Sequence, residues 1–269
     1  MSLRNRTLLT VGGVLLLLVV ALIIAAQMIL VSGFEQLEDK NAREHVERVT
    51  NTINDEISAM LSTTADWAHW DDTYNFILGE NDTYVEDNLS SDTLINLDVN
   101  LMIFINTEGE IIFSRAIDTD SGEDIDLPEG LDAYLNPDGM LVHHTEEMSA
   151  VGGILLLPDG PLMVTSRPIL TNQIQGPIHG ALILGRFFDA ARTQLLSDTL
   201  KLDISLYPLD EQLPDDLQTI RGELTDLSSI YIHPVSNTLL DGYGLLADVD
   251  GNPALLLAIH LDRDILAQG

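Results

Sequence analysis

The residues best suited to chemistry form a run of aromatic and acidic side chains at positions 66–76. It holds both tryptophans of the chain, Trp67 and Trp70, together with Asp71 and Tyr74. At helical spacing these four residues fall on one face, where ring N–H and O–H groups need partners and a carboxylate can accept from them or bind a cation. Two interpretations follow: the wall of a ligand pocket, or an aromatic cluster that locks a helix to a sheet.

Three arginines, Arg115, Arg167 and Arg186, each stand at the end of a predicted apolar strand. If their guanidinium groups converge near one sheet end, they could clamp a carboxylate or phosphate ligand through paired donors. Alternatively, they pair with acids and tie the helix to the sheet. The acids considered for that role are Asp71, Asp72 and Glu86.

The sequence offers little for a metal or a cofactor. Residues 118–126 are dense in oxygen ligands, but Gly122 falls at the fifth rather than the sixth position of an EF-hand loop, so the pattern fails. His143 and His144 are adjacent, which points their rings apart, and the histidines show no zinc-site spacing. Cysteine is absent. We therefore expect no metal site and no cofactor.

Motifs for catalysis are missing as well. The chain contains no Gly-x-Ser-x-Gly elbow and no glycine-rich phosphate loop, and carboxylate pairs are too common in it to carry information. We expect no catalytic residues and no enzyme. The rival interpretation, a membrane-tethered hydrolase, would require a cleft that places His143 or His179 beside a serine or an aspartate.

A long helix must position the aromatic run. Apolar residues recur at steps of three and four from Ala42 to Trp67, with polar residues between them, and no proline interrupts residues 3–127. The stripe could dock on the domain's own sheet or form the seam of a parallel homodimer, and both could hold at different heights of the helix.

The helix is predicted to begin inside a membrane. Residues 8–31 carry no charge and are long enough to cross a hydrocarbon core of about 30 Å. A cleaved signal peptide, with a weak site near residues 25–27, is the alternative. Arg4 and Arg6 precede the span and acids follow it, so the positive-inside rule places the N-terminus in the cytoplasm and the bulk of the chain outside the cell membrane.

Charge narrows the range of partners. Only Arg4 and Arg6 of the 12 basic residues precede Gly33, whereas all 43 acidic residues follow it, and the net charge is -31. Such a surface repels phosphate groups, so we expect no nucleic-acid partner. The same composition is also typical of a salt-adapted surface.

Beyond residue 88 the helical period of the hydrophobic residues ends and the sequence becomes strand-like. Strands are predicted at 101–105, 110–115, 162–167, 180–186, 202–206, 229–233, 239–248 and 254–261, with a helix at 187–200. Helices do not alternate with the strands, so the fold class is α+β, a long helix packed on an antiparallel sheet with further C-terminal strands.

The run Trp-x-x-Trp-Asp-Asp-Thr-Tyr at 67–74 and the segments at 84–89, 100–115, 158–161, 166–169 and 180–186 resemble the type-four CHASE extracellular sensory domain over roughly residues 40–200. The resemblance implies a Cache- or PAS-like sensor outside a prokaryotic membrane that feeds a histidine kinase, a diguanylate cyclase or a similar output. The second span and output domain of such receptors are missing from this sequence. Residues 201–261 are poorly covered by the resemblance.

These observations predict an organisation along the chain. Residues 1–7 form a cytoplasmic N-terminus, 8–31 a transmembrane helix, 32–66 an amphipathic stalk, 67–200 the sensor domain and 201–269 its strand-rich C-terminal portion. The expected function is that of a receptor input region, which binds an unidentified small molecule and forms a homodimer. The candidate ligand-binding residues are Trp67, Trp70, Asp71, Tyr74, Arg115, Arg167 and Arg186. The alternative is a module that dimerises or docks a partner without a small ligand.

Overall fold

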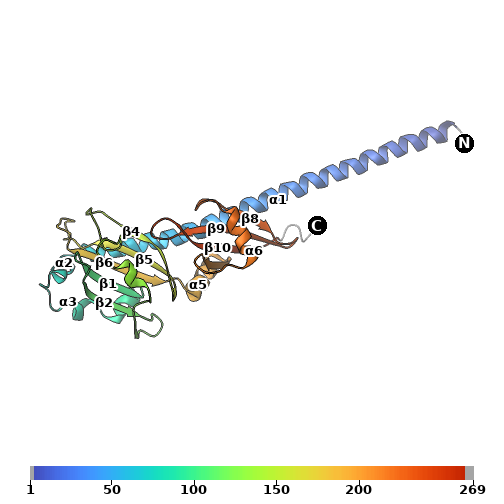
Figure 1. Ribbon diagram of the computed structural model, residues 1–269. Coiled ribbons are helices and arrows are strands. Elements are labelled where there is room, and N and C mark those ends of the chain that lie inside the picture. The colour runs from blue at the N-terminus through green and yellow to red at the C-terminus, as the bar shows by residue number, and fades with distance from the viewer. Residues whose placement is uncertain (1–2, 264–269) are drawn as a thin grey trace.

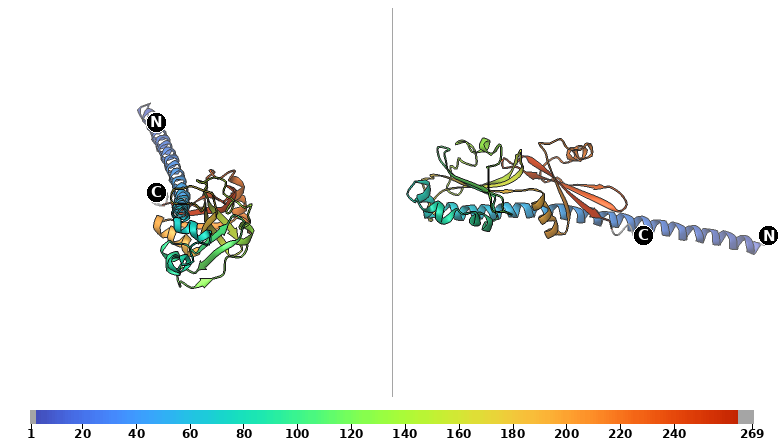
Figure 2. Two further views of the ribbon diagram at one scale, coloured as in Figure 1. Left: turned by 90° about the vertical axis from the view of Figure 1, so that its left-hand side faces the viewer. Right: turned by 90° about the horizontal axis from the view of Figure 1, so that it is seen from below.

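One helix, α1 (Leu3–Ala68), forms the spine of the protein and carries two antiparallel sheets on one side (Figure 1). The computed structural model describes residues 3–263. The view from below shows both sheets lying against the same side of α1, one after the other along its axis (Figure 2). We refer to the sheet farther from the N-terminus of the helix as the distal sheet and to the nearer one as the proximal sheet.

The N-terminal part of α1 extends away from both sheets. It contains an 18-residue window with a mean hydropathy of 2.9, none of which is buried in the structure. Exposed leucines, valines and isoleucines of this kind require an apolar solvent. The stretch is one candidate transmembrane helix.

The remainder of α1 packs on the sheets through the predicted apolar stripe. Its buried residues are Ala42, Val46, Val49, Ile53, Ile57, Met60, Thr64 and Ala68. Since this stripe is covered by the chain's own strands, docking on the domain's own sheets is confirmed. Between Ala42 and Ala68, a dimer seam would have to use another face of the helix.

The distal sheet has six strands in the order β3-β2-β1-β6-β5-β4, and each neighbouring pair is antiparallel. Its strands are β1 (Leu101–Asn106), β2 (Ile111–Ile117), β3 (Asp124–Ile125), β4 (Val151–Leu157), β5 (Gly160–Pro168) and β6 (Gly180–Phe187). Four short helices precede or connect them: α2 (Asp71–Ile77), α3 (Tyr84–Asn88), α4 (Ser91–Asn96) and the 3-10 helix η1 (Leu131–Tyr134).

Both faces of the distal sheet are filled by apolar side chains. Met102 and Met163 belong to the cluster on the α1 face, whereas Ile103 and Val164 belong to a second cluster with Leu141. Alternation along each strand separates the two sets. The segment between β3 and β4 therefore covers the face that α1 leaves free.

The proximal sheet has four strands in the order β7-β10-β9-β8. They are β7 (Asp203–Pro208), β8 (Tyr231–Pro234), β9 (Leu239–Ala247) and β10 (Pro253–Asp262). The helix α5 (Ala190–Leu200) connects the sheets, and α6 (Asp215–Glu223) covers the outer face of the proximal sheet through Leu217 and Ile220.

Two glycines of β9 seat α1 on the proximal sheet. A Cβ atom at Gly242 or Gly244 would lie 2.8 Å from a methyl carbon of Val46. Glycine is therefore the residue that lets the helix axis come this close to the strand.

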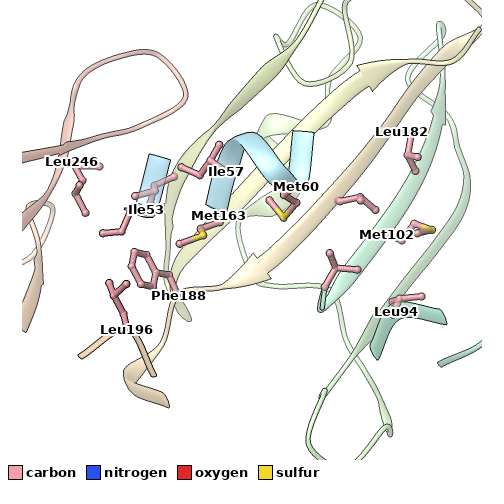
Figure 3. Packing of buried hydrophobic residues seen from close by; sticks show 14 of the residues in the cluster. Ile53, Ile57, Met60, Leu94, Met102, Met163, Leu182, Phe188, Leu196 and Leu246 are labelled. Atoms are coloured by element: carbon pink, nitrogen blue, oxygen red, sulfur yellow. The ribbon is translucent and has the colours of Figure 1, made fainter. Parts of the chain in front are cut away.

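The two sheets meet around α1. Figure 3 shows Ile53 of the helix between Met163 of the distal sheet and Leu246 of the proximal sheet, with Phe188 beside them, and these residues belong to one buried cluster. In the backbone, an isolated parallel bridge joins Ile154 of β4 to Asp248 after β9. The shared helix and this bridge connect the two sheets.

An ion pair ties the last strand to the start of the stalk. Glu38 Oε2 lies 2.8 Å from Arg263 Nη2, and their side chains are 10% and 9% exposed. Arg263 also donates to the Ser236 carbonyl over 3.1 Å. Glu38 Oε1 is buried and has no hydrogen-bond partner among the described residues.

The α+β class and the long helix with antiparallel strands are confirmed. The predicted strands coincide with observed ones to within a few residues, but the strands form two separate sheets. The sequence prediction missed β4, whose start contains Gly152 and Gly153, and the acidic helix α6.

Candidate functional site

The helix α1 ends in the middle of the aromatic run, which corrects the prediction that Trp67, Trp70, Asp71 and Tyr74 share one helical face. Helix α1 stops at Ala68, Trp70 is extended with φ -113° and ψ 131°, and α2 starts at Asp71. Neither proline nor glycine causes this break.

Hydrogen bonds to the segment after β5 explain the break. The Leu170 N–H donates to the Ala68 carbonyl over 3.1 Å, and the Asp71 N–H donates to Asn172 Oδ1 over 3.2 Å. Asp71 Oδ1 accepts from the Asn172 N–H over 2.8 Å. A continuing helix would need the same carbonyl and the same N–H for its own bonds, so tertiary contacts replace helical ones here.

The two indoles pack edge to face, with ring centroids 6.0 Å apart, against the apolar core. Trp70 lies 6.0 Å from Tyr84, whose ring stacks on Phe76 at 4.6 Å. The Tyr84 hydroxyl and Thr73 Oγ1 form a 2.6 Å hydrogen bond. Burial raises the pKa of Tyr84 to about 12. This geometry is that of a rigid aromatic cluster between the helix end and the sheet.

Tyr74 and Asp71 face the segment that follows β5. The Tyr74 ring meets His179 edge to face at 5.0 Å, and Asp71 makes the reciprocal pair with Asn172. We call the place where the end of α1, α2 and residues 167–179 meet the distal junction. It contains Trp67, His69, Trp70, Asp71, Tyr74, Arg167, Asn172 and His179.

Arg167 and His69 give the distal junction its electrostatic character. Arg167 Nη1 donates to the carbonyls of Met148 and Ser149, both over 3.3 Å. Within the described range, Arg167 Nε and His69 Nε2 are buried without a hydrogen-bond partner. Burial, and then the charge of Arg167, lower the pKa of His69, so the imidazole is neutral at pH 7. The junction thus holds one half-buried cation and two buried nitrogen atoms, Arg167 Nε and His69 Nε2, that are available for a hydrogen bond.

His144 extends this polar region to the opposite face of the distal sheet. Its Nε2 lies 2.8 Å from Ser166 Oγ and its Nδ1 lies 2.8 Å from Ser149 Oγ. Ser166 Oγ donates to the Leu141 carbonyl over 2.6 Å. Burial, followed by the charges of Arg167 and His143, lowers the pKa of His144 to about 4. A neutral imidazole therefore fastens the loop before β4 to the sheet.

Arg115 lies away from the distal junction. Its Nε is 2.7 Å from Asp124 Oδ1 and its Nη1 donates to the Leu89 carbonyl over 2.8 Å. The residue stands on β2, and these two bonds link the strand to β3 and to the end of α3. Its guanidinium is thus occupied by structural partners.

Arg186 belongs to an ionic cluster at the other end of the β5–β6 pair. It approaches Asp98 Oδ2 at 3.1 Å and Glu56 Oε2 at 3.7 Å, and its Nε donates to the Asp98 carbonyl. Arg192 of α5 pairs with the same two carboxylates at 2.7 and 3.0 Å. This cluster ties α1 to β6, to the loop before β1 and to α5.

The structure brings five predicted site residues to the distal junction and separates the other two. Arg115, Arg167 and Arg186 do not converge, and none of the contacts above joins them to Asp71, Asp72 or Glu86. The sequence prediction omits His69, although it lies between the two tryptophans, and it considers His144 only as a metal ligand. In residues 3–263, no group of three or more His, Asp or Glu side chains is arranged to hold a metal ion.

The sequence is similar to a known domain family and to a histidine kinase. A family model of the CHASE4 domain matches residues 52–207. The methanogenesis regulatory histidine kinase FilI of Methanothrix harundinacea (strain 6Ac) is 32% identical over 274 residues, covering 100% of this chain and 30% of that protein. The chain therefore corresponds to less than a third of the length of this relative.

Solved structures share the fold. The extracellular domain of vpHK1S-Z8, described as a histidine kinase, superimposes with a TM-score of 0.56 at 14% identity, covering 85% of this chain and 92% of that one. The periplasmic domain of Vibrio cholerae LuxQ gives a TM-score of 0.53 at 11% identity, with coverage of 82% and 98%. The fold of this chain is thus shared with the extracellular domain of one of these proteins and the periplasmic domain of the other.

Proposed function

Because the chain belongs to the CHASE4 family of sensor domains, we propose that it is the extracytoplasmic input region of a prokaryotic membrane receptor. A change at the distal sheet is relayed along α1 through the membrane to a cytoplasmic output. The output in the relative FilI is a histidine kinase, and a kinase is the form we propose here as well.

The observation that carries this proposal is the continuity of α1. The same helix contains the candidate span and supplies core residues to both sheets, from Val46 at the proximal sheet to Thr64 at the distal one. A displacement of either sheet therefore acts on the segment inside the bilayer. The effective coupling free energy in such systems is typically about 1–3 kcal/mol.

We place the ligand at the distal junction. Among residues 3–263, the buried Arg167 Nε and the buried His69 Nε2 have no hydrogen-bond partner, and an unpaired buried polar group is costly. A carboxylate would accept from Arg167 in a charge-assisted bond, while Trp70 and Tyr74 would flank its apolar part. The proposed ligand class is a small carboxylate.

A second candidate function is the docking of a protein without a small ligand. The packing of both faces of the distal sheet favours it, since Ile103 and Met102 lie in filled apolar clusters on opposite faces. A homodimer belongs to this proposal too. It would use the polar side of α1, which includes the exposed residues Asn51, Asp55 and Ser62.

Thermal stability of the full chain in lipid nanodiscs tests the ligand proposal. We expect a carboxylate from a panel of mono- and dicarboxylic acids to raise the melting temperature in a saturable manner, with at least tenfold weaker binding to Arg167→Ala and Trp70→Ala. Arg115→Ala is the matched control, because Arg115 lies on the same sheet outside the junction. Unchanged binding to Arg167→Ala would contradict the site.

The orientation of the chain across the membrane is tested separately by cysteine labelling. Background labelling of the protein is not expected, because the chain has no cysteine of its own. We expect a membrane-impermeant maleimide to label Glu86→Cys on intact cells and to label Asn5→Cys only after lysis. The reverse pattern would place the acidic domain in the cytoplasm and contradict the receptor proposal.

A further inference from the structure

The outer edge of β2 is largely open. Along its length β2 pairs with β1, but on the other side β3 pairs only with Ala116 and Ile117. Among the described residues, no strand lies beside the remaining part of this edge, which starts at Ile111. Open edges of this kind are templates for a further strand.

The direction of the backbone groups can be assigned by alternation. The Ile117 N–H donates to the Asn100 carbonyl at the β1 side, and the Asp118 N–H donates to Glu123 on the opposite side. Successive residues of a strand direct their groups to opposite sides, so the N–H and C=O of Ser114 point outward. Ser114 thus offers both groups to an incoming strand.

The surface beside this edge is apolar and hollowed. Ile111 and Ile112 are 41% and 37% exposed. A hollow of about 440 Å³ lies between residues 113–116 and residues 124–127, where the chain diverges from β2 after β3. Natural edges usually carry lysine or proline to prevent pairing, and this one carries isoleucine instead.

The acidic segment beside the hollow favours a positively charged occupant. Asp124 and Asp126 line the hollow, and the segment to which they belong, residues 118–129, contains six acidic residues and neither lysine nor arginine; we call this segment the acidic rim. The charge of Arg115, which also lines the hollow, is taken up by Asp124. A second copy of this chain would bring the same acidic rim and a net charge of -31, so a positively charged partner is favoured.

We propose that the outer edge of β2 is a docking site for an extended basic segment of a partner protein. The segment adds to the distal sheet as an edge strand, with backbone hydrogen bonds to Ser114 and with lysine or arginine side chains toward the acidic rim. This docking site is separate from the ligand site proposed at the distal junction, because the outer edge of β2 and the distal junction lie on opposite sides of the sheet's central strands.

A matched pair of variants at Ser114 tests the proposal. The probe is a fluorescein-labelled seven-residue peptide of alternating lysine and valine, titrated against the full chain in zwitterionic nanodiscs and followed by anisotropy. We expect saturable binding to the unaltered chain and to Ser114→Ala. Ser114→Pro should weaken it at least tenfold, because proline removes the outward N–H without removing a bond to β1.

A second pair keeps the test decisive if the proline variant unfolds. Ile112→Lys should weaken binding at least tenfold and Ile112→Gln by less than threefold, and backbone N-methylation of the peptide should abolish binding. Equal affinity for the two members of either pair, or binding that survives N-methylation, would reduce the interaction to charge alone and overturn the proposal. Absence of saturable binding, or a dimer that Ser114→Pro converts to a monomer, would overturn it as well.

Discussion

His144 illustrates how one buried residue sets a pH dependence. Its two ring nitrogens are both engaged by serine hydroxyls, and burial lowers its pKa to about 4 from an ordinary value of 6.5. The unfolded chain therefore binds this proton more tightly than the folded chain. The contribution of His144 to stability is present above pH 6.5 and is lost as the pH falls toward 4.

We predict that this loss amounts to about 2–3 kcal/mol between pH 7.5 and pH 4.5. In His144→Gln the amide replaces the ring without titrating. The difference in unfolding free energy between the unaltered chain and this variant should therefore shrink as the pH is lowered, as measured by denaturant unfolding at each pH. If this difference in unfolding free energy does not change with pH, the pH dependence does not come from His144.

At the scale of single residues, the sequence predicts some positions and not their partners. Trp67 and Trp70 were recognisable because two large rings beside acids need both burial and hydrogen bonds. The partners of Arg167 and Arg186 were not, because a guanidinium on a strand end can reach any of several loops. Which carbonyl or carboxylate it meets depends on the path of those loops.

At the scale of elements, the packing of α1 on β9 depends on Gly242. A Cβ there would lie 2.8 Å from Val46 Cγ2 and 3.0 Å from Ile259 Cγ1. Gly242→Ala is expected to destabilise the chain by about 1–3 kcal/mol. The double variant Gly242→Ala/Val46→Ala removes the Val46 methyl groups that the new Cβ would meet. Its loss of unfolding free energy should therefore be about 1 kcal/mol smaller than the sum of the losses in the two single variants.

Denaturant unfolding followed by circular dichroism measures this cycle. The control is Gly222→Ala in α6, where nothing lies within 4 Å of the added Cβ. That change should be neutral or stabilising, because alanine favours a helix. Strict additivity of Gly242→Ala and Val46→Ala would show that the helix does not rest on this glycine.

Elements with a strong period could be predicted, whereas their interruptions could not. The stripe from Ala42 to Thr64 follows from burial of one helix face, and the continuous apolar runs of β1, β6 and β10 follow from burial of both strand faces. The break at Trp70 is imposed by Leu170 and Asn172, which lie about a hundred residues later in the chain. The helix propensity of residues 66–76 does not predict hydrogen-bond partners that lie so far away in the sequence.

At the scale of the whole molecule, self-repulsion is the dominant electrostatic feature. With a net charge of -31, the folded state concentrates like charges that the unfolded state spreads out. Raising the salt concentration from about 0.1 M to about 1 M shortens the Debye length from about 10 Å to about 3 Å. We predict that sodium chloride in this range stabilises the chain by about 1–2 kcal/mol.

Calorimetry in nanodiscs measures this effect as a rise in melting temperature. Most of the rise should occur below about 0.3 M, where screening changes fastest, and potassium chloride should act equally. A melting temperature that falls or stays constant with salt would show that the acids are compensated locally. Sequence patterns do not predict the division of the chain into two sheets, because the central strands of both sheets, such as β1 and β10, are similar apolar runs.

The position of α1 ahead of every described strand also determines the order in which the elements are synthesised. The ribosome completes this helix before any strand exists, so the scaffold on which both sheets assemble is synthesised first. The distal sheet can then close once β6 has emerged, while the proximal sheet must wait for β10. Translation thus supplies the sheets in order from the far end of α1 back toward its N-terminal half.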